Sequence, residues 1–178
     1  FRNFLTTVLH PMNALPSQSR FIIGTEACER FSFYGMKSIL MLYMTGHLLM
    51  SENWATSTLH IFVGMVYLLP VAGAWLADKV WGRYKTILYI SLLYCVGHGV
   101  LATADLFQTI EARRYILMAG LLIIALGAGG IKPCVSAFMG DQIPDKSPRL
   151  MTKAFNAFYW AINLGSFFSF LVIPAMEQ

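Results

Sequence analysis

Five apolar stretches, each long enough to cross a lipid bilayer, constrain the fold of this 178-residue chain more than any other feature. Crossing a hydrocarbon layer ~30 Å thick takes about 20 residues of α-helix. A soluble core of this size cannot bury five such helices. Only 12% of the residues are charged, which is about half the share in an ordinary soluble domain. Because lipid offers the backbone no hydrogen-bond partner, we expect an all-α integral membrane protein. The predicted spans are residues 21–49, 54–77, 87–104, 115–139 and 154–174.

The distribution of basic residues predicts how these helices are oriented. Eight Lys and Arg residues fall on one side of the predicted membrane: Arg2, Arg20, Lys79, Arg83, Lys85, Lys146, Arg149 and Lys153. The opposite side has only Arg113 and Arg114. Positively charged loops stay in the cytosol. We therefore expect a cytosolic N-terminal lead over residues 1–20 and one transmembrane bundle over residues 21–178, in a plasma or inner membrane.

The basic loops also account for the net charge of +4. No basic patch interleaved with aromatic residues lies outside the spans, so no nucleic-acid partner is expected. Cys28, Cys95 and Cys134 lie inside apolar stretches without metal-ligand spacing, which predicts packing residues and no metal site. No nucleophile with its base and no phosphate-binding glycine loop is present in the sequence, so we expect neither an enzyme nor a cofactor.

Four charged residues lie inside the first predicted span, where each costs at least ~2.5 kcal/mol. Glu26, Glu29, Arg30 and Lys37 recur at helical spacing and fall, with Phe33, on one stripe of the helix. Glu26 and Arg30 form an i,i+4 pair in the favourable orientation. One interpretation is a buried ion network that fixes helix packing. We favour a proton-binding site, because burial and the neighbouring charges oppose one another in setting proton affinity.

Residue depth, at ~1.5 Å per helical residue, places Lys132 of the fourth span in the same layer as Glu26 and Glu29. We expect Lys132 to form a direct or water-bridged contact with one of these carboxylates, which offsets its burial. Three further polar residues fall slightly deeper and are expected to complete one polar cavity: Tyr67, Tyr159 and Asn163.

The charged stripe also carries a recognisable motif. Residues 26–35, Glu-Ala-Cys-Glu-Arg-Phe-Ser-Phe-Tyr-Gly, resemble the E-x-x-E-R-F-x-Y-Y-G signature of the proton-dependent oligopeptide transporter family. Three more segments resemble major facilitator and family motifs in the same order: residues 73–86 (GAWLADKVWGRYKT), 130–133 (GIKP) and 158–165 (FYWAINLG).

This resemblance implies a proton-coupled symporter of di- and tripeptides that works by alternating access, with protons as the coupling ion. It also implies a major facilitator fold, of which the chain is an N-terminal fragment with about five transmembrane helices. The absent C-terminal bundle of the same transporter is then its partner, together with the lipid bilayer. Two alternatives stay open: a related major facilitator carrier for nitrate, amino acids or drugs, and a non-transporting membrane scaffold.

The resemblance also implies three groups of functional side chains. The expected proton-coupling residues are Glu26, Glu29, Arg30, His60 and Lys132. The expected peptide-binding residues are Tyr34, Lys37, Tyr67, Tyr159 and Asn163. The expected gating loop contains Asp78, Arg83 and Lys85, with Asp78 paired to one of the two cations.

Some of these positions have a second interpretation or depart from the family signature. His60 matches a histidine of the animal carriers, but a lone histidine on an apolar helix is also compatible with a structural role. Phe33 replaces a signature tyrosine and lacks its hydroxyl group. Lys37 replaces an arginine, which puts a point charge where the family has a bidentate fork. The two departures predict a different substrate preference.

Overall fold

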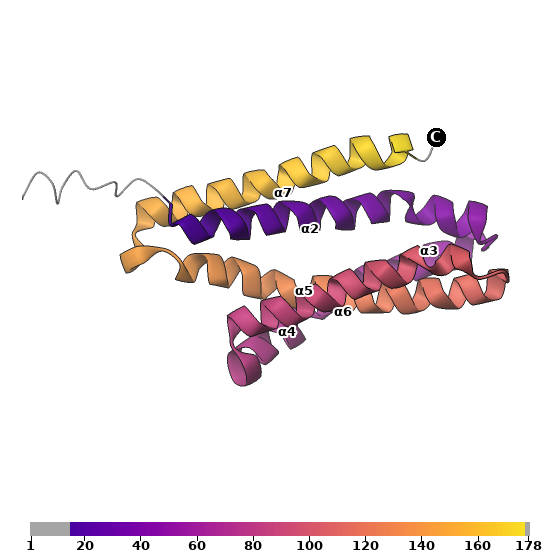
Figure 1. The fold of residues 1–178 in the computed structure, drawn as a ribbon, viewed down its shortest axis with the longest axis horizontal. Helices are drawn as coiled ribbons and strands as arrows, with labels where there is room; N and C mark the ends of the chain where they lie inside the picture. The colour runs from indigo at the N-terminus through magenta and orange to yellow at the C-terminus, as the bar shows by residue number, and fades with distance from the viewer. Residues whose placement is uncertain (1–14, 177–178) are drawn as a thin grey trace, which may run out of the picture.

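Helices make up nearly all of the computed structural model, which describes residues 15–176 (Figure 1). The α-helices are α2 (Ser17–Leu42), α3 (Glu52–Leu68), α4 (Pro70–Leu76), α5 (Arg83–Ala102), α6 (Ile110–Asp141) and α7 (Pro148–Met176). The π-helical turns η1 (Tyr43–His47) and η2 (Ala77–Trp81) extend α2 and α4, and the 3₁₀ turns η3 (Ala104–Leu106) and η4 (Pro144–Lys146) lie in the connections. No strand occurs within residues 15–176, and the all-α prediction is confirmed.

Four helical stretches within the described residues are long and apolar enough to cross a membrane: Glu52–Trp81, Arg83–Leu106, Ile110–Asp141 and Pro148–Met176. Each contains one predicted span and extends beyond it at both ends. The first predicted span falls on α2 and η1, which end at His47. This charged helix is not among the four, but it lies alongside the apolar helix α7 (Figure 1). Most of the expected lead, residues 1–14, lies outside the described residues.

The bundle is built around two closely packed helix pairs. α5 packs along α6, and α2 packs along α7 (Figure 1). α3 and α4 lie on α6, whereas direct contact between α2 and α6 is limited. α6 is therefore the central helix, and it is the most buried of the four apolar stretches. The charged stripe of α2 borders the space between the two pairs.

Small residues bring the helix backbones close together. Gly73 on α4 lies directly against the backbone of Gly130 on α6, so that no Cβ fits at Gly73. Gly165 on α7 lies in the same way against the Ala27 carbonyl of α2. Next to it, the Ser169 hydroxyl donates to the Phe31 carbonyl at 2.6 Å. These contacts fix α2 on α7 and thereby fix the direction of its charged stripe.

The connection predicted over residues 78–86 is mostly helical. η2 continues to Trp81, and Gly82 alone interrupts the helix before α5 begins at Arg83. Gly82 has a φ of +78°, which glycine adopts without the clash that a Cβ causes. The chain therefore turns at one residue, which decides where the side chain of Arg83 lies.

At the opposite end of the bundle, Arg114 of α6 closes the turn that follows α2 and η1. Its guanidinium donates to the Leu48 carbonyl at 2.7 and 3.0 Å and to the Leu49 carbonyl at 2.8 Å. It also lies 5.3 Å from the centre of the Trp54 ring. Leu49 has a φ of +50°, which is uncommon for a residue with a Cβ. Arg114 thus satisfies carbonyl groups that a helix end leaves without partners.

Candidate functional site

A buried ion network occupies the N-terminal part of α2, which is the part predicted to lie nearer the cytosol. Arg30 lies between Glu26 and Glu29, and the exposed fractions of the three residues are 6%, 7% and 9%. The Arg30 Nε lies 3.2 Å from Glu26 Oε1, and the guanidinium also contacts Glu29 Oε2. Glu26 reaches Arg30 because the two residues stand one helical turn apart. Two carboxylates share a single guanidinium in this network.

One carboxylate oxygen of the network has no hydrogen-bond donor beside it among the described residues. Glu29 Oε1 is buried and has no hydrogen-bond partner among the described residues. A buried carboxylate oxygen without a donor is costly, and a proton bound there removes the excess negative charge. The arrangement therefore has the chemistry of a site that exchanges a proton.

Lys132 of α6 approaches this network but contacts aromatic rings instead of carboxylates. Its Nζ lies 4.8 Å from the centre of the Tyr67 ring and 5.7 Å from that of Phe33. No carboxylate oxygen of the described residues lies within 4.0 Å of it. Glu29 and Glu26 remain within electrostatic range. The shared layer is thus observed. Of the two contacts that were predicted, direct or water-bridged, the direct ion pair is absent, and cation–π contacts take its place.

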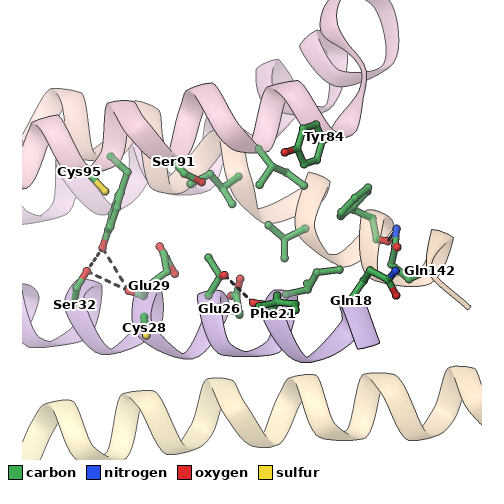
Figure 2. Close-up of a pocket in the computed structure, with 17 residues that line it drawn as sticks. Gln18, Phe21, Glu26, Cys28, Glu29, Ser32, Tyr84, Ser91, Cys95 and Gln142 are labelled. Carbon is green, nitrogen blue, oxygen red and sulfur yellow. Dashed lines mark hydrogen bonds between the residues drawn. The ribbon is translucent and has the colours of Figure 1, made fainter. Parts of the chain in front are cut away.

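A cavity of about 550 Å³ opens between α2, α5 and α6 (Figure 2). Its lining is mostly apolar, and Glu26 and Glu29 are the only charged residues among those described that line it. In Figure 2, Glu29 points from α2 toward the space below α5. This is not the single polar cavity that was predicted, because Tyr67, Tyr159 and Asn163 do not line it. Two of these residues are on α7, which packs along α2 and does not line the cavity.

Tyr94 of α5 forms a link to the network that sequence reasoning did not identify. Its hydroxyl lies 2.5 Å from Ser32 Oγ and 3.4 Å from the Glu29 carbonyl oxygen (Figure 2). The contact joins α5 to the turn of α2 that carries Glu29. Tyr94 belongs to no motif and is one of eight tyrosines, so the sequence held no signal that distinguishes it.

Comparison with known proteins assigns the family. Residues 84–178, which are more than half of the chain, match the POT family. The chain belongs to the POT family. Peptide transporter family 1 of Drosophila melanogaster is 46% identical over 91% of this chain and 22% of its own length. Peptide transporter 3 of Caenorhabditis elegans is 41% identical over 96% and 24%, and human solute carrier family 15 member 1 is 38% identical over 94% and 25%.

Solved structures of POT family transporters have the same fold. The crystal structure of the POT family transporter PepTSo matches with a TM-score of 0.82 at 46% identity, covering 92% of this chain and 32% of that one. A peptide transporter POT in complex with alafosfalin matches with a TM-score of 0.78 at 34% identity, covering 88% and 32%. This POT family chain is thus an N-terminal bundle of the major facilitator fold, as its motifs predicted. It spans about a quarter of the length of the curated relatives that it matches.

The other residues predicted to serve proton coupling or peptide binding on α2 and α3 differ in their contacts. The ring of Tyr34 lies 6.0 Å from the Arg30 guanidinium and packs on Phe170 of α7. Lys37 is half-buried and His60 is exposed. Neither forms a hydrogen bond or an ion pair with another of residues 15–176. Lys37 therefore has no anionic partner within residues 15–176.

Three predicted peptide-binding residues lie on exposed helix faces. Tyr67 is exposed on α3, and Tyr159 and Asn163 are exposed on α7. Tyr159 and Asn163 border a shallow cavity of about 370 Å³, together with Asn156 and Trp160. The Asn163 amide donates to the Tyr159 carbonyl at 2.9 Å. The sequence placed these residues in one cavity, but Tyr67 does not border the cavity that Tyr159 and Asn163 line.

Arg83 of the predicted gating loop has a different partner from the one expected. It forms an ion pair with Asp141 at the end of α6, at 2.5 Å. Asp78 and Lys85 are exposed and form no ion pair within the described part of the chain. The turn at Gly82 directs Arg83 to α6, which explains why Asp141 takes the place predicted for Asp78.

Proposed function

We propose that the full-length protein is a proton-coupled symporter of di- and tripeptides that works by alternating access. The observation that carries this proposal is the buried Glu26–Arg30–Glu29 network, in which Glu29 Oε1 has no hydrogen-bond partner among the described residues. Membership of the POT family and the peptide-transporter relatives support it. Because the chain spans only part of those relatives, a second bundle must complete the transport path. Protons serve as the coupling ion, and no other cofactor is required.

In this mechanism Glu29 and Glu26 bind the proton, and Arg30 stabilises their ionised form. A change in the surroundings of the network during alternating access then loads or releases the proton. His60 and Lys132 assist in coupling, and Lys37 binds the carboxylate end of the peptide. Tyr34, Tyr67, Tyr159 and Asn163 contact the substrate once both bundles enclose it. Arg83, with Asp78 and Lys85, forms the part of the gate contributed by this chain.

The proposal is tested by Glu29→Gln in the full-length protein, reconstituted in vesicles. Glutamine keeps the size of the side chain but cannot bind and release a proton. We expect uptake of a labelled dipeptide driven by a pH gradient to be lost. Exchange of dipeptide at equal concentrations should persist in part, because exchange needs binding and rocking but no net proton movement.

A matched control is Glu111→Gln, which neutralises an exposed carboxylate near the start of α6. It should leave both assays unchanged. If the Glu29→Gln protein still concentrates dipeptide against a gradient, Glu29 has a structural role. If the unsubstituted protein takes up nitrate or amino acids but no dipeptide, the proposed substrate class is wrong.

We also propose that the N-terminus and the connections at Arg83 and Arg149 lie in the cytosol, following the asymmetry of the basic residues. An impermeant thiol reagent added outside intact cells should label Glu111→Cys and should not label Arg149→Cys. The unsubstituted protein, with Cys28, Cys95 and Cys134, gives the background. External labelling of Arg149→Cys would show that the proposed orientation is wrong.

A further inference from the structure

Two cations of the bundle meet at a single aromatic ring. The Arg30 guanidinium lies 5.5 Å from the centre of the Phe33 ring, and the Lys132 ammonium lies 5.7 Å from the same centre. The two cations come from different helices, α2 and α6. Phe33 is 5% exposed, so the contact is shielded from solvent.

The Phe33 ring is fixed in this position by its neighbours. It packs on the Phe62 ring of α3 at 5.9 Å with an angle of 29°, and on the Tyr34 ring at 5.5 Å with an angle of 83°. Both arrangements are favourable for aromatic pairs. Because three rings support one another, Phe33 cannot move away from the cations without disrupting the core.

An aromatic ring attracts a cation without neutralising it. The negative ring face stabilises an ammonium group in a desolvated site, but it accepts no proton and forms no ion pair. Lys132 lies over Phe33 and over Tyr67, whereas Arg30 alone contacts the carboxylates of Glu26 and Glu29. The rings thus provide an alternative location for the Lys132 charge, away from the carboxylates.

We propose that Phe33 is a positioning residue for proton coupling, which keeps the Lys132 ammonium on ring faces and off the Glu26–Glu29 pair. This inference rests on the proposed function, in which these carboxylates bind the proton. It adds a role for a residue that lacks the hydroxyl group of the signature tyrosine. The aromatic ring, and not a hydroxyl group, is what the geometry uses.

The charged and titratable groups around the site determine which contacts the Lys132 ammonium can form when the Phe33 ring is removed. On α2, α3, α5 and α6 they are Glu26, Glu29, Arg30, Tyr34, Lys37, Tyr67, Tyr94 and Lys132. The carboxylates are the only anions in this set, and both are within electrostatic range of Lys132. Without the ring, the ammonium is expected to approach them and to favour their ionised form.

The test compares three variants of the full-length protein in pH-dependent uptake of a labelled dipeptide. Phe33→Leu keeps an apolar side chain but removes the ring face. We expect the pH of half-maximal uptake to move to more acidic values, on the order of one pH unit, because a carboxylate beside an ammonium needs a higher proton concentration to become protonated. Phe33→Tyr keeps the ring and should keep the pH profile of the unsubstituted protein.

Phe62→Leu is the matched control for packing. Phe62 is 1% exposed and stacks on Phe33, but no cation lies over its ring among the described residues. It should reduce the amount of folded protein and leave the pH of half-maximal uptake unchanged, because the Phe33 ring is still present and still packs on Tyr34. A Phe33→Leu profile that coincides with that of Phe62→Leu overturns the positioning role. If the unsubstituted protein shows no pH-driven uptake, the proposed function fails instead, and the two failures are distinguishable.

Discussion

The ion pairs of Arg30 and of Arg83 have the same chemistry and opposite surroundings. Arg30 contacts Glu26 and Glu29 with side chains that are 7% to 9% exposed. Arg83 contacts Asp141 with side chains that are 40% and 46% exposed. Solvent screens the exposed pair and competes for its partners, whereas the buried network has no such substitute. We therefore expect the buried contacts to be essential for folding and coupling, and the exposed pair to be exchangeable.

The largest effect is expected from Arg30→Gln in the full-length protein. Removing the guanidinium leaves two buried carboxylates without a cation, and breaking a buried pair costs about 3–5 kcal/mol. The measurement is the melting temperature of the purified protein in detergent. Neutralising Glu26 and Glu29 as well, with glutamine at both positions, should recover part of the lost stability because no buried carboxylate then lacks its guanidinium.

Lys37→Gln is the control for removing a cation from the same helix. Lys37 is half-buried and forms no ion pair with the other described residues, so its loss should change the melting temperature far less. If both variants melt alike, burial of the network does not determine its contribution.

An intermediate effect is expected from Arg114→Gln. Arg114 is half-buried, and its three hydrogen bonds join α6 to the turn after α2 across 65 and 66 positions of sequence. A hydrogen bond to a charged group contributes about 1.5–3 kcal/mol, and part of this is recovered by water. The melting temperature should therefore fall, but by less than for Arg30→Gln.

The neighbouring residue provides the comparison. Arg113 donates to the carbonyls of Phe107 and Asp105, which lie six and eight positions away in the same connection. Arg113→Gln removes only local contacts and should leave the melting temperature close to that of the unsubstituted protein. A larger loss for Arg113→Gln than for Arg114→Gln would contradict the view that long-range contacts matter more here.

How well the sequence predicted each region follows from the distance between its partners. Glu26 and Arg30 stand one helical turn apart, so the periodicity of an α-helix was enough to pair them. The layer shared by Lys132 and the carboxylates followed from counting residues along two helices. Asp141 lies 58 positions from Arg83, and no periodicity relates them.

Side-chain direction was the part that the sequence could not supply. Depth alone predicted a direct or water-bridged contact between Lys132 and a carboxylate, but the direct contacts of its ammonium are with the rings of Tyr67 and Phe33. Depth also predicted one cavity for Tyr67, Tyr159 and Asn163. The rotation of each helix about its own axis decides which face meets the cavity. It depends on the packing of α7 on α2 for Tyr159 and Asn163, and on the packing of α3 on α6 for Tyr67.

The smallest effect is expected at the exposed pair. Arg83→Gln should leave the melting temperature unchanged within error, because water replaces the lost partner of Asp141 and both side chains are partly solvated in the folded protein. Asp141→Asn should behave in the same way. The change in melting temperature of the double variant should equal the sum of the changes of the two single variants, which means that the pair has no measurable coupling. The difference in melting temperature between the unsubstituted protein and the double variant should not change when the salt concentration is raised, since an exposed contact is already screened. If the double-mutant cycle instead gives a coupling as large as the effect of Arg30→Gln, the pair is desolvated in the full-length protein. A second bundle must then cover Arg83, and the contrast between the two regions would hold only for this chain alone.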